Sequence, residues 1–161
     1  MKGIIIYATR HGCTEKAVKL LQKKLPDGIE SVNIGKEKAP DLSLYDTVIF
    51  GGPIYVGKTL KPLTDYIQRN LDVLKKKKVA LFLCAGEQDL QRTDALFAGA
   101  FPEELCKISF AREFFGGELY WEKLDFMTKL ILRLVKGING GYSRLSEEKI
   151  KKFASDVELA R

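Results

Sequence analysis

The sequence predicts an α/β fold in which a doubly wound, five-stranded parallel sheet is covered by helices on both faces. Short, nearly continuous apolar runs recur along the chain, as expected of strands buried on both faces of a sheet. Segments with apolar residues at helical spacing separate these runs, and strands that alternate with helices form parallel sheets. No linker, repeat or low-complexity segment divides the 161 residues, so one domain spanning residues 1–161 is expected.

The first half of the chain supplies three of the expected strands and two helices. The strands are the apolar runs at residues 2–7, 29–34 and 46–52. The first helix has its apolar face within residues 17–25 and ends at Pro26-Asp27-Gly28. The second helix has apolar residues at helical spacing between Leu60 and Leu71, with Pro62 in the first turn, where proline is tolerated.

The second half begins with the clearest strand pattern, at residues 78–86. A less regular helix is expected near residues 92–98, and a fifth strand within residues 106–117. Ser146 is the expected N-cap of the last helix. The inner face of that helix is formed by Ile150, Phe153, Ala154 and Val157.

An additional segment, residues 122–138, lies between the fifth strand and the last helix. Wound as a helix, it gathers apolar side chains on one broad face and cations on the other. The apolar residues are Leu124, Met127, Leu130, Ile131, Leu134, Val135 and Ile138; the cations are Lys129, Arg133 and Lys136, which share their face with Glu122 and Asp125. This is the pattern of a basic amphipathic helix, which either packs on its own domain or lies on an anionic membrane.

Composition and charge restrict the expected partners and compartment. Lys and Arg total 27 against 21 Asp and Glu, which gives a net charge of +6. The lysine run at residues 75–78 has no interleaved aromatic residues, so nucleic acid is not an expected partner. Three cysteines without CxxC spacing and a single histidine indicate neither a disulfide framework nor a metal site. No segment resembles a signal peptide or a membrane span, which predicts a cytoplasmic protein, with peripheral contact at the inner face of the membrane as the alternative.

The loop that joins the first strand to the first helix, ATRHGCTEKA at residues 8–17, has the features of a phosphate site. Thr9 and Thr14 bracket a turn at Gly12, where backbone N–H groups and the helix dipole favour an anion. Thr14 stands at the expected N-cap, and Gly12 permits close backbone approach. The other loop residues assigned to the site are Arg10, His11 and Cys13. An ordinary strand-to-helix turn with a threonine cap is the alternative.

Residues 52–59, GPIYVGKT, match the pattern G-x-x-x-x-G-K-[ST] of nucleotide triphosphatases letter for letter. The interior of this segment, residues 53–56, is ring-locked, bulky or β-branched. Such residues resist positive φ angles and favour extended backbone. The strand at residues 78–84 is also followed by no Asp that could hold a metal ion. The match is therefore interpreted as coincidental.

The carboxyl ends of the third and fourth strands are expected to hold a flat ring, because ligands of open parallel sheets bind at this edge. Tyr55 follows the third strand beside Pro53 and Ile54, and Gly57 allows close backbone approach. The fourth strand is followed by Cys84, Ala85, Gly86 and Glu87, whose main-chain groups face the polar edge of such a ring. One phosphate loop flanked by two ring-binding loops predicts FMN, with Tyr55 as an ordinary packed tyrosine as the alternative.

The first strand is apolar, ends in the aromatic residue Tyr7, and is followed by the pattern Ser/Thr-x-x-Gly-x-Thr, which Thr9, Gly12 and Thr14 supply. In this strand and loop the chain resembles the flavodoxins. The resemblance covers residues 1–160 and implies strand order 2-1-3-4-5 with bound FMN. More narrowly, ATRHGCT and residues 120–141 are similar to the flavodoxin-fold protoporphyrinogen IX dehydrogenases that use menaquinone. The chain departs from ordinary flavodoxins at His11, where a hydroxyl residue is common, and in its basic net charge.

The resemblance implies an FMN-dependent oxidoreductase that oxidises protoporphyrinogen or another reduced substrate and passes electrons to a quinone. Tyr120 and Trp121 would then form a wall for a large flat substrate, unless they are ordinary buried aromatic residues. No catalytic acid or base is assigned. The alternative is a non-catalytic electron carrier that docks acidic protein partners through its lysines. In either case, positive charge is expected to make the potential of the flavin less negative than in acidic flavodoxins.

Overall fold

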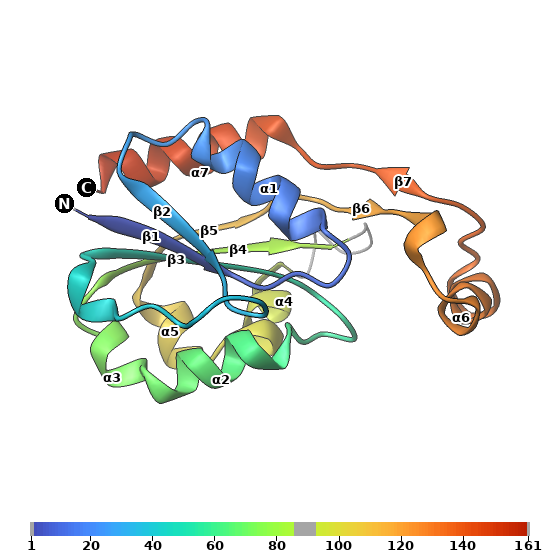
Figure 1. The fold of residues 1–161 in the computed structure, drawn as a ribbon, viewed down its shortest axis with the longest axis horizontal. Helices are drawn as coiled ribbons and strands as arrows, with labels where there is room; N and C mark the ends of the chain where they lie inside the picture. The colour runs from blue at the N-terminus through green and yellow to red at the C-terminus, as the bar shows by residue number, and fades with distance from the viewer. Residues whose placement is uncertain (1, 86–92, 161) are drawn as a thin grey trace.

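The computed structural model describes residues 2–85 and 93–160, and a five-stranded parallel sheet forms its centre. The strands are β1 (Gly3–Tyr7), β2 (Ile29–Asn33), β3 (Thr47–Pro53), β4 (Lys78–Cys84) and β5 (Ser109–Phe114). Their order is β2-β1-β3-β4-β5, and every neighbouring pair is parallel (Figure 1). The expected fold class and strand order are both confirmed.

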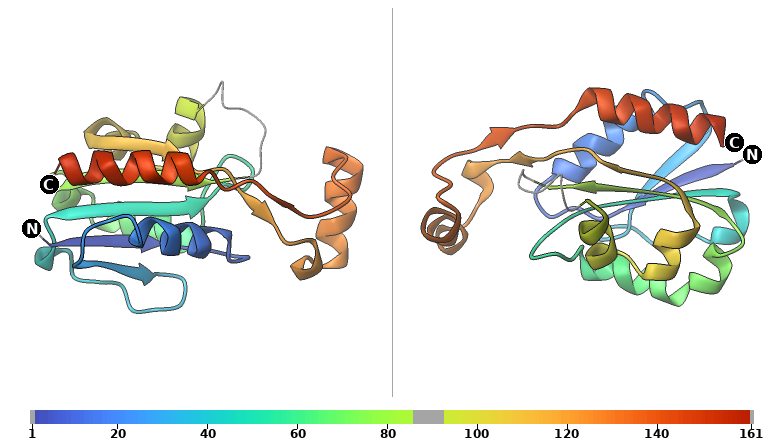
Figure 2. Two further views of the ribbon diagram at one scale, coloured as in Figure 1. Left: turned by 90° about the horizontal axis from the view of Figure 1, so that it is seen from above. Right: turned by 180° about the vertical axis from the view of Figure 1, so that it is seen from behind.

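Helices cover both faces of this sheet (Figures 1 and 2). One face carries α1 (Cys13–Gln22) and α7 (Glu147–Leu159), and the other carries α2 (Lys61–Arg69), α3 (Leu71–Leu74), α4 (Thr93–Ala100) and α5 (Glu103–Ile108). Successive side chains of a strand point to opposite faces. In β1, Ile4 and Ile6 therefore join the core under α2–α5, whereas Ile5 and Tyr7 join the core under α1 and α7.

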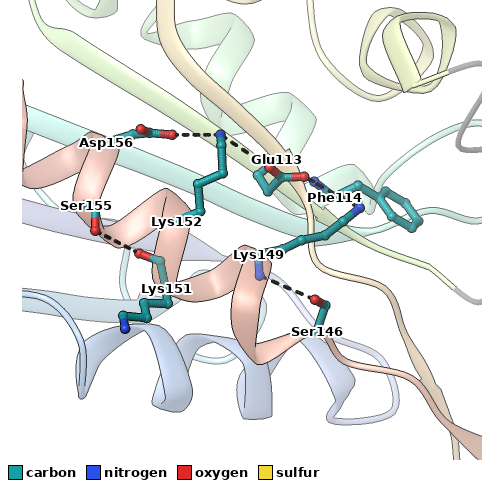
Figure 3. Close-up of polar contacts among 8 residues, drawn as sticks. All are labelled: Glu113, Phe114, Ser146, Lys149, Lys151, Lys152, Ser155 and Asp156. Atoms are coloured by element: carbon teal, nitrogen blue, oxygen red, sulfur yellow. Dashed lines mark hydrogen bonds and ion pairs between the residues drawn. The ribbon is translucent and has the colours of Figure 1, made fainter.

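The last helix begins where the sequence predicts. The Ser146 hydroxyl accepts a hydrogen bond from the Lys149 amide at 3.3 Å, and the expected inner face is buried. The Nζ atoms of Lys149 and Lys152 each lie 3.7 Å from the Glu113 carboxylate of β5 (Figure 3). Lys152 also pairs with Asp156 at 3.2 Å. Partly exposed ion pairs of this kind contribute little stability, so burial of the apolar face holds α7 on the sheet.

Between β5 and α7 the chain forms an arm, residues 117–145, which extends beyond the carboxyl ends of the strands (Figures 1 and 2). The arm contains the antiparallel pair β6 (Glu118–Leu119) and β7 (Tyr142–Ser143), a 3₁₀ turn at Trp121–Lys123, and α6 (Phe126–Lys136). At its base, Gly116 has a φ of 80°, and a Cβ atom there would lie 2.0 Å from the Arg144 carbonyl oxygen. The two chain segments of the arm therefore meet this closely only around glycine.

The additional helix is shorter than the range 122–138 expected from the sequence. Asp125 caps its start, because the carboxylate accepts a hydrogen bond from the Thr128 amide at 2.8 Å. Gly137, with a φ of 63°, ends the helix in the left-handed conformation. Within residues 2–85 and 93–160, no helix is both long enough and apolar enough to cross a membrane.

The segment that matches the triphosphatase pattern folds as a tight turn. The Tyr55 amide donates to the Lys58 carbonyl at 2.8 Å, and the Lys58 amide donates to the Tyr55 carbonyl at 3.1 Å. Val56 and Gly57 have φ angles of 50° and 75°, so the expectation that Val56 keeps an extended backbone is wrong. The paired hydrogen bonds of a turn with two positive φ angles impose this conformation. Lys58 is exposed, and α2 begins only at Lys61, so the segment does not form a phosphate loop that opens a helix.

Candidate functional site

A cavity of about 250 Å³ opens at the carboxyl ends of β1, β3 and β4. The structure brings most of the expected site residues into its wall: Thr9, His11, Cys13, Thr14, Pro53, Ile54, Tyr55, Cys84 and Ala85. Arg10 and Gly12 line an adjoining cavity, whereas Gly57 lines neither of the two. Gly86 and Glu87 lie outside the described residues.

The adjoining cavity is polar and shares Thr9 and His11 with the first one. Its remaining lining residues are Arg10, Gly12, Glu15, Lys36 and Lys123. The three cations come from three places in the fold: the first loop, the segment after β2, and the arm. This convergence of positive charge at the start of α1 favours an anion.

The first loop differs in detail from the expected capped turn. Gly12, with a φ of 92°, is the N-cap of α1, and its amide donates to the Thr9 hydroxyl at 3.0 Å. The expectation that Thr14 is the N-cap is therefore wrong, because a left-handed glycine starts the helix two residues earlier. Thr14 lies in the first turn and is fully buried; its hydroxyl lies close to the Cys84 thiol but makes no hydrogen bond of normal geometry. A buried polar group without a partner in a cavity wall is unusual and points to a ligand.

Two free thiols form part of the cavity wall. The Cys13 sulfur accepts a hydrogen bond from the Glu118 amide at 3.1 Å and lies beside the Cys84 thiol. The contact with Cys84 lowers the pKa of Cys13, an effect that burial opposes and the Glu118 amide reinforces. The same contact, together with complete burial, raises the pKa of Cys84. Of the two thiols, Cys13, next to the helix start, is therefore the one that loses its proton more readily.

Tyr55 projects from the end of β3 and is 38% exposed. The His11 ring meets it edge-on, with 6.3 Å between centroids and 85° between planes. The Arg10 guanidinium carbon lies 5.9 Å from the centre of the Tyr55 ring. Burial, followed by the charges of Arg10 and Lys123, lowers the pKa of His11, while Asp125 acts in the opposite direction. The tyrosine is thus held against the first loop at the rim of the cavity, beside a neutral imidazole at pH 7.

Glu118 anchors the arm to the sheet. Its buried carboxylate accepts hydrogen bonds from the Lys16 ammonium of α1 at 2.6 Å and from the hydroxyls of Ser143 and Tyr120. Burial alone would raise the pKa of Glu118, but these three hydrogen bonds hold it below its usual value. The carboxylate is therefore charged at neutral pH and links β6 and β7 to the start of α1.

The comparisons with known proteins agree with this arrangement. Residues 4–146 match the model of the family described as a flavodoxin domain. The chain belongs to the flavodoxin domain family. No curated protein matches it.

Three solved structures show that the fold of this flavodoxin domain recurs at low sequence identity. A short-chain flavodoxin associated with a bacterial microcompartment is 15% identical over 100% of both chains, with a TM-score of 0.61. A Fusobacterium nucleatum flavodoxin bound to flavin mononucleotide is 14% identical over 99% of both chains, with a TM-score of 0.54. Rubredoxin oxygen:oxidoreductase from Desulfovibrio gigas is 15% identical, with a TM-score of 0.55; the match covers 99% of this chain and 35% of that one. The flavodoxin-domain chain thus spans about a third of the latter protein.

The arm adds cavity-lining residues to this flavodoxin domain that the sequence interpretation missed. They are Gly117, Glu118, Leu119, Leu124, Thr128, Leu132, Ile138 and Tyr142. The expected substrate wall of Tyr120 and Trp121 does not line either cavity: Tyr120 bonds to Glu118, and Trp121 lies 5.2 Å from the Arg133 guanidinium carbon. Lys36, Gly117 and Glu118 follow β2 and β5. Applying the rule that ligands bind at the carboxyl ends of strands to β2 and β5 as well would have predicted these residues.

The residues around the two cavities fit a phosphorylated flat heterocycle. Where the two cavities meet, the Thr14 hydroxyl of the first cavity, together with the glycine N-cap and three cations of the adjoining one, suits a phosphate group. Ile54, Tyr55 and Ala85 suit the faces and edge of a ring. Within residues 2–85 and 93–160, no group of three or more His, Cys, Asp or Glu side chains is placed to hold a metal ion.

Proposed function

We propose that this protein binds FMN and transfers electrons through it. The buried Thr14 hydroxyl carries the proposal, because it makes no hydrogen bond of normal geometry within the protein and stands at a helix start beside a cation-lined cavity. When bound, FMN supplies the chemistry of hydride and single-electron transfer. The protein has to bind the cofactor, orient it and limit the access of water.

Each part of the wall then has a role. The amides at the start of α1 and the hydroxyl of Thr14 donate to the phosphate, while Arg10, Lys36 and Lys123 balance its charge. Tyr55 packs on one face of the ring, and the main chain at Ala85 faces its polar edge. The apolar residues of the arm cover the site and exclude water from it.

Two matched valine variants test the phosphate contact. Thr14 and Thr47 are both buried threonines whose hydroxyls make no hydrogen bond of normal geometry, but Thr47 stands at the amino end of β3, far from the cavity. Thr14→Val is expected to weaken FMN binding about 10-fold or more, because a hydrogen bond to a charged group contributes about 1.5–3 kcal/mol. Thr47→Val should bind FMN as the wild type does. Flavin fluorescence quenching measures both affinities.

Riboflavin, which lacks the phosphate, is the control ligand. Its affinity should be the same for the wild type and Thr14→Val, because the removed hydroxyl serves only the phosphate. A colourless protein that does not quench added FMN would contradict the proposal. Equal FMN affinity in the two valine variants would show that the phosphate binds elsewhere.

For the reaction itself, we propose oxidation of a flat, largely apolar reduced substrate of the protoporphyrinogen class, with a quinone as acceptor. Support comes from Leu119, Leu124 and Leu132, apolar residues of the arm that line the cavity. In each cycle the substrate would lose an electron pair with the accompanying protons and the quinone would become the quinol, with bound FMN supplying the redox chemistry between them. Anaerobic mixing with protoporphyrinogen IX should bleach the bound flavin, and menaquinone should restore its colour.

The second candidate is an electron carrier that docks acidic proteins, which the net charge of +6 favours. A carrier would exchange electrons with an acidic redox protein at a rate that falls steeply with salt, and it would not turn over protoporphyrinogen with menaquinone. Both measurements on the same preparation therefore separate the two functions.

A further inference from the structure

The outer side of α6 carries an unusual concentration of exposed apolar side chains. Twelve large apolar residues are exposed in the described part of the chain, and six of them lie on this one helix. They are Phe126, Met127, Leu130, Ile131, Leu134 and Val135, each between 36% and 77% exposed. We call these six residues the outer apolar face. The other six exposed apolar residues are spread over five separate parts of the chain, so the outer apolar face is the one concentrated patch among them.

The cavity does not account for the outer apolar face. Thr128 and Leu132 of α6 line the cavity, so the helix already has an inner side. At roughly 100° per residue, the side of the helix opposite these two residues carries Phe126, Met127, Leu130 and Leu134. Ile131 and Val135 continue the exposed face around the helix to the edge of the inner side. Both views in Figure 2 show α6 beyond the carboxyl ends of the strands and apart from the helices that cover the sheet.

Cations border this face. Lys129 and Arg133 are one turn apart on α6, between the inner side and the outer apolar face, and Lys123 lies in the turn that leads into the helix. Of the two acidic residues nearby, Asp125 is engaged as the N-cap. Trp121 lies beneath the Arg133 guanidinium at the base of the helix, and tryptophan favours the boundary between lipid and water.

We propose that the outer apolar face docks on an anionic lipid membrane, with the helix lying in the plane of the surface. An apolar sector bordered by Lys and Arg is the pattern of a helix that binds such a surface. A helix of 11 residues is roughly 16 Å long and cannot span a bilayer, so it lies on the membrane rather than across it. A second copy of the chain is a less suitable occupant, because packing the two faces together would bring Lys129 and Arg133 of both copies close to each other.

Vesicle sedimentation tests the proposal with the full chain, both without flavin and after addition of FMN. The wild type is expected to bind vesicles that contain phosphatidylglycerol and to bind pure phosphatidylcholine at least 10-fold more weakly. Its single tryptophan, Trp121, should shift its emission to the blue on binding. Ile131→Glu/Leu134→Glu should reduce binding to the anionic vesicles at least 10-fold. Lys129→Gln/Arg133→Gln should remove most of the preference for anionic lipid.

Leu159→Glu and Val73→Glu are the matched controls, because both residues are exposed apolar positions on other helices. They should bind vesicles as the wild type does. Absence of wild-type binding would overturn the proposal, as would equal binding by Ile131→Glu/Leu134→Glu. A dimer in light scattering that Leu134→Glu makes monomeric, without vesicle binding, would assign the face to a second copy instead. Since vesicle binding is measured without flavin as well, failure of the FMN proposal would not be mistaken for failure of this one.

Discussion

Val56 has a left-handed backbone conformation, with a φ of 50°, although it is β-branched and its side chain is fully exposed. A β-branched residue in this region is strained, and no burial offsets the cost here. Asparagine tolerates the conformation, and Asn-Gly is the preferred pair for a turn with two positive φ angles. Val56→Asn is therefore expected to raise the free energy of unfolding by about 1 kcal/mol. Urea denaturation measures the change.

Val56→Ile is the control for this prediction, since it keeps the β-branch and the exposure. It should leave the stability unchanged within about 0.5 kcal/mol. If Val56→Asn and Val56→Ile have equal midpoints, the strain at this position is negligible.

FMN binding is expected to depend on pH through His11. Burial and the neighbouring cations lower the pKa of the free imidazole, and a bound phosphate in the adjoining cavity would raise it again. The protonated form is then favoured in the complex, so FMN binding takes up a proton. The additional FMN affinity that comes from the protonated imidazole is fully present below the imidazole pKa of the free protein. It is lost as pH rises through the higher imidazole pKa of the complex. The ratio of the FMN affinities of wild type and His11→Gln should fall at least threefold between pH 6 and pH 8.

The ionisation of the FMN phosphate near pH 6 affects both proteins equally, so the affinity ratio isolates the imidazole. Calorimetry in two buffers of different ionisation enthalpy gives an independent count of the protons taken up. Equal pH profiles for the wild type and His11→Gln would show that the imidazole does not respond to the phosphate.

At the scale of elements, the predictable parts are those whose signal is local. The apolar run of β4 and the inner face of α7 follow directly from residue periodicity, and both are confirmed. The start of α6 at Phe126 was not predicted, because the cap depends on one Asp125 contact that periodicity does not show. The short strands β6 and β7 have two residues each and pair across more than twenty residues. Their role in anchoring the arm depends on the contact between Glu118 and Lys16, two residues that are far apart in the sequence.

The anchor of the arm is expected to depend on the charge of Glu118. Glu118→Gln keeps the size of the side chain but removes the charge that Lys16 contacts. Loss of one charged hydrogen bond to a partly exposed lysine should lower the free energy of opening the arm by roughly 1 kcal/mol. The population of the open arm then rises about fivefold. Amide hydrogen exchange should accelerate by that factor in residues 117–145 and remain unchanged in β1 and β3.

Glu103→Gln, which removes an exposed pair with Lys107 on the same helix, is the control and should leave the arm unaffected. The pKa of Glu118 lies below its ordinary value of 4.5, so the anchor is complete above that pH. It weakens as pH falls through the lower value of the folded protein. Equal exchange in the arm of the wild type and Glu118→Gln would mean that β6 and β7 are held by other contacts.

For the whole molecule, net charge is the property that bears on the proposed redox function. The net charge is +6, and the cavity expected to hold the phosphate is lined by Arg10, Lys36 and Lys123 against one carboxylate, Glu15. Two-electron reduction of FMN with uptake of one proton gives a flavin anion, which nearby cations would stabilise. One positive charge about 15 Å away contributes about 1 kcal/mol at an effective dielectric constant near 20. This corresponds to roughly 40 mV for a one-electron step, less after screening by salt.

Two consequences follow for the couple that ends in fully reduced FMN. Its midpoint should be less negative than in acidic flavodoxins, and added salt should make it more negative, because screening removes stabilisation of the anion. In an acidic protein the same screening acts with the opposite sign. Lys36→Gln/Lys123→Gln should lower the midpoint by tens of millivolts, whereas Lys76→Gln, an exposed lysine just before the amino end of β4, should not. Potentiometric titration at low and high salt measures all three proteins. A wild-type midpoint that rises with salt would mean that acidic groups, rather than these cations, set the potential of the bound flavin.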